Sequence, residues 1–263
     1  MVGSFFDRPD ITRVLFHPRI DPSLDEDDAR RKTVRFNVAE GVTLGGRLYP
    51  AAQDAPAILY FHGNGEIASD YDDWAPFYTR LGLTLLVVDY RGYGISTGTP
   101  RASTLLEDAV SVFQQTPALL AGQGLAPARL LVMGRSLGSA AALMVAAAAS
   151  SEKPAVSGLI IESGFANSLA LVERLSGVPA IGADESRDGF GALGHIKSVT
   201  VPTLIIHGEE DYLIPIREGR ALFEAAGAAD KRWLAIPKAG HNDLMMVGVD
   251  RYFPAVAALA QAA

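Results

Sequence analysis

The sequence of 263 residues contains no cysteine. This absence excludes a disulfide framework, a zinc site with cysteine ligands and a cysteine nucleophile. A chain without cysteine is compatible with a reducing compartment, and we expect a cytoplasmic location. The chain can form a large hydrophobic core without disulfides, because 49% of its residues are hydrophobic and its length suits one large α/β domain.

Positive charge is also scarce, with 23 Lys and Arg residues against 30 Asp and Glu residues, for a net charge of −7. Proteins that bind nucleic acid neutralise phosphates with clustered Lys and Arg. We therefore expect no nucleic-acid partner. The densest acidic run, at 25–28, is followed at once by basic residues at 30–32, a pattern typical of a solvated surface segment with compensating charges.

Long hydrophobic runs are missing as well. The longest, at 137–149, is interrupted by glycine and serine and falls short of the roughly 20 residues that span a bilayer. Asp7 and Asp10 stand near the start of the chain without a continuous apolar run, so we expect neither a signal peptide nor a stable membrane anchor. The apolar side chains of residues 1–19 can touch a membrane surface or pack on the core. We favour packing on the core.

Short apolar runs that alternate with helical patterns make up most of the sequence. Thr33–Val38 and Arg47–Tyr49 predict a hairpin with glycines 41, 45 and 46 at its bends. Runs that are apolar at every position are typical of strands buried on both faces of a parallel sheet. Such runs lie at 57–61, 84–89, 129–133, 158–162, 203–207 and 232–236, and helical patterns lie near 70–81, 103–116, 137–149, 217–226 and 250–261. The alternation predicts an α/β fold with helices on both faces of the sheet.

One connection is longer than the others. About 40 residues separate Glu162 from Thr203, and loops of this length inside a compact domain are often functional lids. A helix is predicted at Ser168–Leu175, within an otherwise irregular segment. We interpret residues 1–263 as a single domain with an N-terminal segment at 1–32 and a small lid insertion at about 164–198.

The sharpest local signal is Gly134-Arg135-Ser136-Leu137-Gly138, directly after an apolar run and directly before an alanine-rich helical pattern. This is the context of a G-x-S-x-G nucleophile elbow. The two glycines let strand and helix approach closely around a strained turn. That turn places the serine hydroxyl at the N-terminus of a helix, where free backbone N–H groups favour developing negative charge. Ser136 is therefore the candidate nucleophile.

A serine hydroxyl is a poor nucleophile until a base accepts its proton. Among the five histidines, His241 alone follows an acidic residue in the chain order serine, acid, histidine that this fold uses. Asp211 comes just after the run at 203–207, at the edge of the sheet where ligands bind in open α/β folds. It is the candidate that orients the imidazole. Glu162, at the end of the preceding run, is a rival acid.

A tetrahedral intermediate also needs backbone donors for its oxyanion. One donor is expected from Leu137, the residue after the nucleophile, and the other from the loop His62-Gly63-Asn64-Gly65. Within that loop the backbone N–H of Asn64 is favoured over that of Gly65.

Six segments together resemble a known superfamily. They are HGNG at 62–65, DYRGYGISTGTP at 89–100, GRSLGSA at 134–140, IESGF at 161–165, PTLIIHGEEDYLIP at 202–215 and AGHND at 239–243. The stretch from about residue 57 to the end is similar to the α/β-hydrolase superfamily, and most of all to the Bem46-type serine hydrolases.

The resemblance implies a mostly parallel eight-stranded sheet with one antiparallel strand near the start, and a triad at Ser136, Asp211 and His241. It also implies hydrolysis of a small-molecule acyl ester or thioester through an acyl-enzyme, without a cofactor or metal. Eukaryotic members of the subgroup often carry membrane anchors. This sequence shows no such signal, so a membrane-bound role is not carried over.

Other functions compete with this interpretation. Gly92-Tyr93-Gly94 follows a strand, as in a dinucleotide-binding turn, but Thr97 stands where the third glycine is required. A non-catalytic binding protein on a hydrolase scaffold typically lacks a triad member, and none is missing here. A peptidase, a thioesterase or an acylglycerol lipase of the same fold stays open. The small lid favours small or extended acyl esters over bulky, fully enclosed substrates.

Overall fold

A computed structural model describes residues 5–21, 27–28, 30–149, 155–177 and 179–262. Within this part of the chain an open, eight-stranded sheet has the order β1-β2-β4-β3-β5-β6-β7-β8. The strands are β1 (Lys32–Ala39), β2 (Val42–Tyr49), β3 (Ala57–Phe61), β4 (Thr84–Val88), β5 (Leu130–Arg135), β6 (Gly158–Glu162), β7 (Thr203–Gly208) and β8 (Lys231–Ile236). β2 runs antiparallel to both of its neighbours, and the pairs from β4 to β8 are parallel. The predicted fold class is confirmed.

Helices connect the strands, mostly where the patterns predicted them. They are α1 (Pro9–Leu15), the 3-10 helix η1 (Ala68–Tyr71), α2 (Ala75–Arg80), α3 (Ala102–Gly122), α4 (Gly138–Ala148), α5 (Ser168–Ser176), α6 (Glu185–Asp188), α7 (Ala192–Ser198), α8 (Ile216–Ala225), α9 (Leu244–Val247) and α10 (Val249–Ala262). The single helix expected near 70–81 is divided in two, with Pro76 in the first turn of α2, where a missing N–H costs no hydrogen bond. The sequence patterns did not predict α1, α6, α7 and α9, all of which are short.

The prediction that glycines 45 and 46 mark bends was wrong. Both lie inside β2, where Gly45 pairs with Arg35 and Gly46 pairs with Val34. Both positions require glycine because neighbouring atoms approach the backbone closely. A Cβ on Gly46 would lie 2.4 Å from a backbone oxygen of β4, and one on Gly45 would lie 2.1 Å from the side chain of Ile95. Only Gly41, with φ of +68°, lies at the turn between the two strands.

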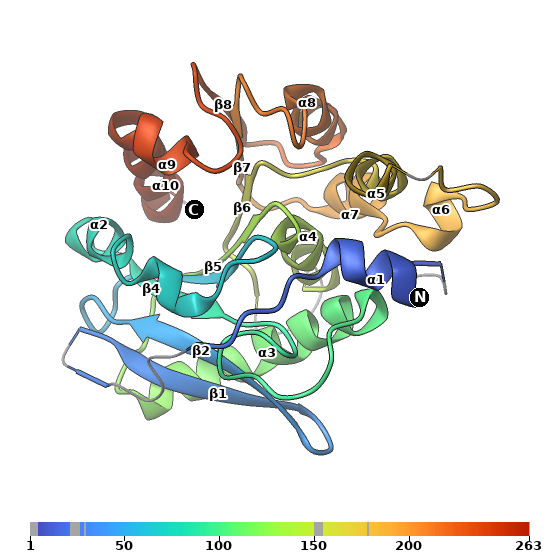
Figure 1. The fold of residues 1–263 in the computed structure, drawn as a ribbon. Helices are drawn as coiled ribbons and strands as arrows, with labels where there is room; N and C mark the ends of the chain where they lie inside the picture. Colours follow the sequence, from blue (N-terminus) through green and yellow to red (C-terminus); the bar gives the residue numbers. More distant parts are fainter. Residues whose placement is uncertain (1–4, 22–26, 29, 150–154, 178, 263) are drawn as a thin grey trace.

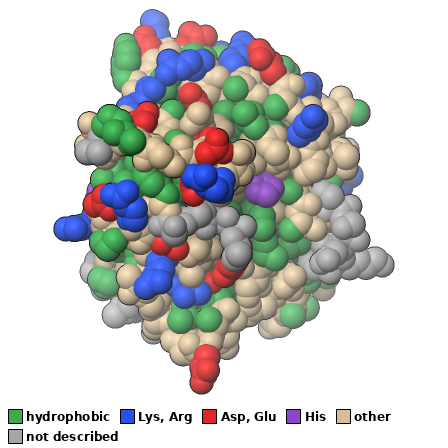
Figure 2. Space-filling model, turned by 90° about the vertical axis from the view of Figure 1, so that its right-hand side faces the viewer, with side chains coloured by type: hydrophobic (Ala, Val, Ile, Leu, Met, Phe, Trp, Pro, Cys, Tyr) green, Lys and Arg blue, Asp and Glu red, His purple; other side chains and the backbone are tan. Residues whose placement is uncertain are grey.

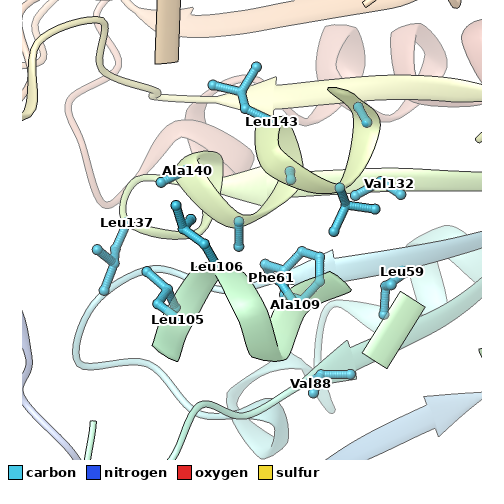
Figure 3. Close-up of a cluster of buried hydrophobic side chains, with 14 of the residues drawn as sticks. Leu59, Phe61, Val88, Leu105, Leu106, Ala109, Val132, Leu137, Ala140 and Leu143 are labelled. Carbon is cyan, nitrogen blue, oxygen red and sulfur yellow. The ribbon is translucent and has the colours of Figure 1, made fainter. Parts of the chain in front are cut away.

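Strand side chains alternate between two cores. In β3, Leu59 and Phe61 belong to the larger core with α1, α3, α4, α7 and α8, whereas Ile58 and Tyr60 belong to the other core, with α2 and α10. Figure 1 shows these helices on opposite sides of the sheet. Figure 3 shows part of the larger core, where Leu105 and Leu106 of α3 lie near Leu137. A strand buried on both faces must be apolar at every position, which is why the runs were continuous.

The N-terminal segment packs on the core, as we favoured. Phe6, Leu15 and Phe16 are buried. The ring of Phe6 stacks on that of Phe190, with 5.1 Å between the centroids. α1 lies beside α5, although about 150 residues separate the two helices in the chain.

Charged side chains of both signs lie next to one another on the surface. The face in Figure 2 shows basic and acidic groups interspersed. Arg8 and Asp10 are one such exposed pair, with 2.8 Å between nitrogen and oxygen. Of the predicted acidic run, residues 25 and 26 lie outside the described part, and Asp28 accepts hydrogen bonds from the backbone N–H groups of Arg30 and Arg31. None of the helices described is long and apolar enough to cross a membrane.

Candidate active site

Ser136 lies on a strained turn between β5 and α4. Its φ of 51° falls in the left-handed region, which is costly for a residue with a side chain. A Cβ on Gly134 would lie 2.2 Å from the carbonyl oxygen of Gly138, and a Cβ on Gly138 would lie 2.0 Å from that of Phe61. The two glycines therefore permit the close approach of strand and helix that the elbow motif predicts.

The structure brings the three candidate triad side chains together. Nε2 of His241 lies 3.0 Å from Oγ of Ser136, and its Nδ1 lies 2.8 Å from Oδ2 of Asp211. The other oxygen of Asp211 accepts hydrogen bonds from the backbone N–H groups of Leu213 and Ile214, at 3.0 and 2.7 Å. These contacts form a continuous path of hydrogen bonds from the carboxylate to the serine hydroxyl.

Asp211 is held in its charged form. Burial acts to raise the pKa of its carboxyl, but the hydrogen bond and positive potential from His241, together with the N–H of Ile214, outweigh burial and place the pKa below its usual value. A carboxylate in this position accepts a hydrogen bond from the Nδ1–H group of the imidazole. It therefore leaves Nε2 free to accept a proton from Ser136.

His207 at the end of β7 supports the loop that carries Asp211, a role that the sequence did not reveal. Its Nε2 lies 2.8 Å from the carbonyl oxygen of Ile214 and 3.5 Å from Oδ2 of Asp211. Burial lowers the pKa of the imidazole, so the neutral ring that donates one N–H is favoured. The ring thereby fixes the turn whose backbone holds Asp211.

Glu162, the rival acid, contacts other partners. Its side chain is fully buried and accepts hydrogen bonds from Tyr252 at 2.6 Å and Tyr60 at 3.2 Å, beside Nε of Arg135 at 3.1 Å. Burial raises the pKa of this carboxyl more than the guanidinium of Arg135 lowers it. The structure thus places Glu162 with Arg135, whereas Asp211 is the acid in contact with His241.

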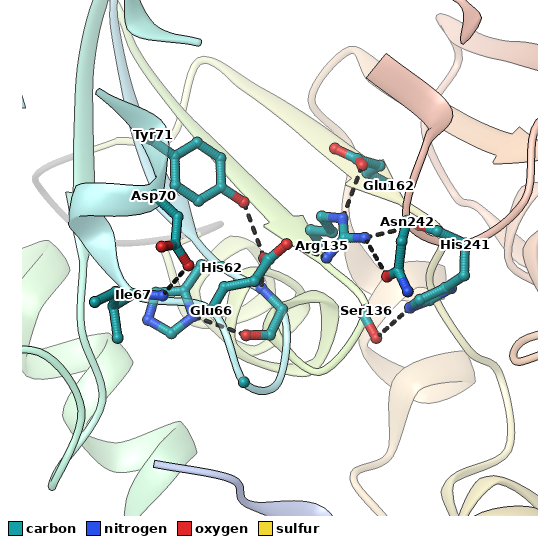
Figure 4. A network of polar contacts seen from close by, with 12 residues as sticks. His62, Glu66, Ile67, Asp70, Tyr71, Arg135, Ser136, Glu162, His241 and Asn242 are labelled. Atoms are coloured by element: carbon teal, nitrogen blue, oxygen red, sulfur yellow. Dashed lines mark hydrogen bonds and ion pairs between the residues drawn. The ribbon is translucent and has the colours of Figure 1, made fainter. Parts of the chain in front are cut away.

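Arg135 lies at the centre of this polar network (Figure 4). One nitrogen forms an ion pair with Glu66, whose pKa burial would raise but the charge of Arg135 holds below its usual value. Another, Nη2, donates hydrogen bonds to the backbone oxygen of His241 at 2.7 Å and to Oδ1 of Asn242 at 3.1 Å. The sequence patterns did not predict this contact, although a charged residue at the end of a buried strand indicates that the charge has a partner.

Leu137 and Asn64, the candidates for the oxyanion hole, line the same cavity as Ser136. Leu137 precedes the first turn of α4, where backbone N–H groups have no partner within the helix. In the loop at 62–65, the N–H of Gly63 donates to Glu66 at 2.6 Å. Gly63 is therefore engaged elsewhere, and Asn64 and Gly65 remain the two alternatives in this loop.

The cavity over Ser136 has a volume of about 360 Å³. Its apolar walls come from three parts of the chain, and they consist of Val14 and Leu15 of α1, Leu171 and Leu175 of α5, and Leu213 and Ile214 after β7. Its polar residues include Asn64, His17 and Asn242. α5 belongs to the segment predicted as a lid, whereas the contribution of α1 was not predicted.

Across the described ranges, no group of three or more His, Asp or Glu side chains is arranged to hold a metal ion.

Comparison with known proteins places the chain in a family. The chain matches the family described as serine aminopeptidase, S33, over residues 52–176 and 191–245. It is similar to the protein bem46 of Schizosaccharomyces pombe, 27% identical over 90% of this chain and 78% of that protein. An uncharacterized protein of Mycobacterium tuberculosis is 32% identical over 88% of this chain and 82% of the relative.

A solved structure shares the fold at low identity. An esterase of Pyrococcus furiosus superposes with a TM-score of 0.68 and 16% identity, over 94% of this chain and 98% of that one. At that identity the likeness supports the common fold alone.

Proposed function

This chain belongs to the serine aminopeptidase S33 family of the α/β-hydrolase superfamily and is of the Bem46 type, and we propose that it hydrolyses carboxylic esters or thioesters. The observation that carries the proposal is the contact of Ser136 with His241, which in turn contacts Asp211. A base within 3.0 Å of a serine hydroxyl on an elbow is the arrangement that activates a serine nucleophile.

In the proposed mechanism, Ser136 attacks the carbonyl carbon of the substrate while Nε2 of His241 accepts the hydroxyl proton. Asp211 stabilises the imidazolium that forms. The backbone N–H groups of Leu137 and Asn64 donate to the oxyanion of the tetrahedral intermediate. His241 then protonates the leaving alcohol or thiol. Water repeats the sequence on the acyl-enzyme and releases the acid.

The cavity favours an ester over a peptide with a free amino terminus. An ammonium group needs an anionic partner, but the charged side chains among the described lining residues are the cations Arg13 and Arg135. The remaining walls are mostly aliphatic. An acyl group fits this lining, and the solved structure of the same fold reported above is itself an esterase.

Hydrolysis of a series of p-nitrophenyl esters, from acetate to palmitate, tests the proposal. Wild type should turn over at least one ester, and Ser136→Ala should lose about 10⁴-fold or more in kcat. A fluorophosphonate probe should label wild type, because labelling requires an activated serine. A binding protein on this scaffold would show neither turnover nor labelling, and a selective peptidase would be labelled but would leave the esters intact.

A further inference from the structure

The N-terminal segment lies across the candidate active site. Val14 and Leu15, at the end of α1, line the cavity over Ser136. The segment is firmly attached, since Ile11 and Leu15 are buried in the larger core and Asp7 accepts a hydrogen bond from the backbone N–H of Ser103 at 3.1 Å. One wall of the cavity is therefore built by residues that precede the first strand.

The residues after α1 contact the loop that carries the candidate oxyanion donor. The backbone N–H of His17 donates to Oδ1 of Asn64 at 2.9 Å, and the hydroxyl of Tyr93 donates to the same oxygen at 2.8 Å. The amide nitrogen of Asn64 lies 2.8 Å from Nδ1 of His17, which can accept its hydrogen. The side chain of Asn64 is thus occupied by these partners, and its backbone N–H is the group that can serve a substrate.

A second contact joins the N-terminal segment to the same loop at Gly65. Nη1 of Arg19 donates to the carbonyl oxygen of Gly65 at 2.9 Å and pairs with Asp70 at 2.7 Å. Asp70 in turn accepts a hydrogen bond from the N–H of Ile67 at 3.1 Å. The N-terminal segment therefore contacts both central residues of the turn, Asn64 and Gly65.

We propose that residues 14–19 form the acyl-binding wall of the site and position the oxyanion loop. Val14 and Leu15 limit the length of the acyl chain, and His17 and Arg19 hold the backbone of Asn64 toward Ser136. The apolar walls are aliphatic and suit an aliphatic acyl chain. This inference rests on the proposed ester hydrolysis.

The first part of the test enlarges Val14. We expect Val14→Trp to lower the ratio of kcat/KM for p-nitrophenyl decanoate over acetate by about tenfold or more, the scale by which pocket contacts discriminate methylene groups. Asp10→Trp, on the exposed face of the same helix, should leave the ratio unchanged. Val14→Ala enlarges the cavity and should shift the optimum to longer chains, which keeps the test decisive if the tryptophan variant fails to fold.

The second part separates positioning from packing. His17→Ala removes the acceptor for the side-chain amide of Asn64. We expect it to lower kcat by about tenfold, which is less than the loss caused by removing an oxyanion donor. The chain-length profile should stay unchanged. His17→Asn retains a side-chain acceptor and should restore most of the activity.

The outcomes separate this inference from the proposed function. A wild type that cleaves neither an ester nor a thioester contradicts the proposed function itself. The acyl wall is contradicted if activity depends on Ser136 but the chain-length profile changes equally in the Val14 and Asp10 variants. Normal kcat in His17→Ala contradicts the positioning role.

Discussion

The guanidinium of Arg135 donates a hydrogen bond of 2.7 Å to the backbone carbonyl oxygen of His241. Arg135 immediately precedes Ser136, so one residue holds the serine through its peptide bond and the histidine loop through its side chain. The buried side chain of Arg135 thereby connects Ser136 with His241, which lies 105 residues further along the chain. A rigid link of this kind keeps nucleophile and base at a fixed distance, which efficient proton transfer requires.

Replacing Arg135 by lysine tests this link. Lysine keeps the charge between the carboxylates of Glu66 and Glu162 but lacks the planar fork that reaches several acceptors at once. We expect Arg135→Lys to lower kcat by up to about 10²-fold, because a small misplacement of the base is costly, with a smaller change in KM.

Arg129→Lys is the matched control for this prediction. Arg129 also donates to a backbone oxygen, that of Ala260 at 3.1 Å, but outside the site. Its replacement should leave kcat near that of wild type. Equal effects of the two substitutions on kcat would show that Arg135 contributes only to folding.

The pH dependence of stability tests the state of Glu162. Burial raises its pKa above the ordinary value of 4.5, so the folded protein binds the proton more tightly than the unfolded chain. The contribution of this group to stability is therefore present at low pH and lost as the pH rises through the folded pKa. Glu162→Gln mimics the neutral form. Its free energy of unfolding in urea, relative to wild type, should rise from pH 4.5 to pH 7, and a constant difference would contradict the raised pKa.

Turnover by two acid variants distinguishes Asp211 from its rival. Asp211→Asn should lower kcat by about 10⁴-fold, because an amide no longer stabilises the imidazolium or enforces its tautomer. Glu162→Gln should retain near-normal kcat, since its carboxylate does not contact His241. Steady-state kinetics on one ester measures kcat for both variants. A larger loss of kcat in Glu162→Gln than in Asp211→Asn would assign the role of the acid to Glu162.

Two glycine substitutions test the close packing under the elbow. Gly138→Ala places a methyl group 2.0 Å from the oxygen of Phe61, so we expect a loss of at least about 2 kcal/mol in the free energy of unfolding. Gly122, at the end of α3, has open space around its Cβ position. Gly122→Ala should raise stability by about 0.5–1 kcal/mol through helix propensity. Urea denaturation measures both, and a neutral Gly138→Ala would contradict the packing.

The strands and the candidate triad were the predictable part of the molecule. β3 and β6 match their apolar runs residue for residue, because a strand covered on both faces must be apolar throughout. Ser136 was recognisable because the elbow is a local motif between a strand and a helix. Asp211 and His241 followed from the chain order of the fold.

The contacts that join distant segments were not predictable in this way. α1 has only seven residues and no side-chain cap hydrogen bond, and nothing local marked it as a wall of the cavity. The contact of His17 with Asn64 spans 47 residues and uses a backbone N–H, which every residue type possesses. The contact of Arg135 with His241 likewise ends on a backbone oxygen. Backbone partners of this kind leave no residue-type signal at their own position in the sequence.

Intact-mass spectrometry after reaction with a fluorophosphonate probe tests whether Ser136 is an activated nucleophile. We expect wild type to gain the mass of one phosphonyl group, peptide mapping to place that group on Ser136, and Ser136→Ala to gain none. Wild type that stays unmodified, or a label on another residue, would contradict the assignment of Ser136 as a nucleophile activated by His241.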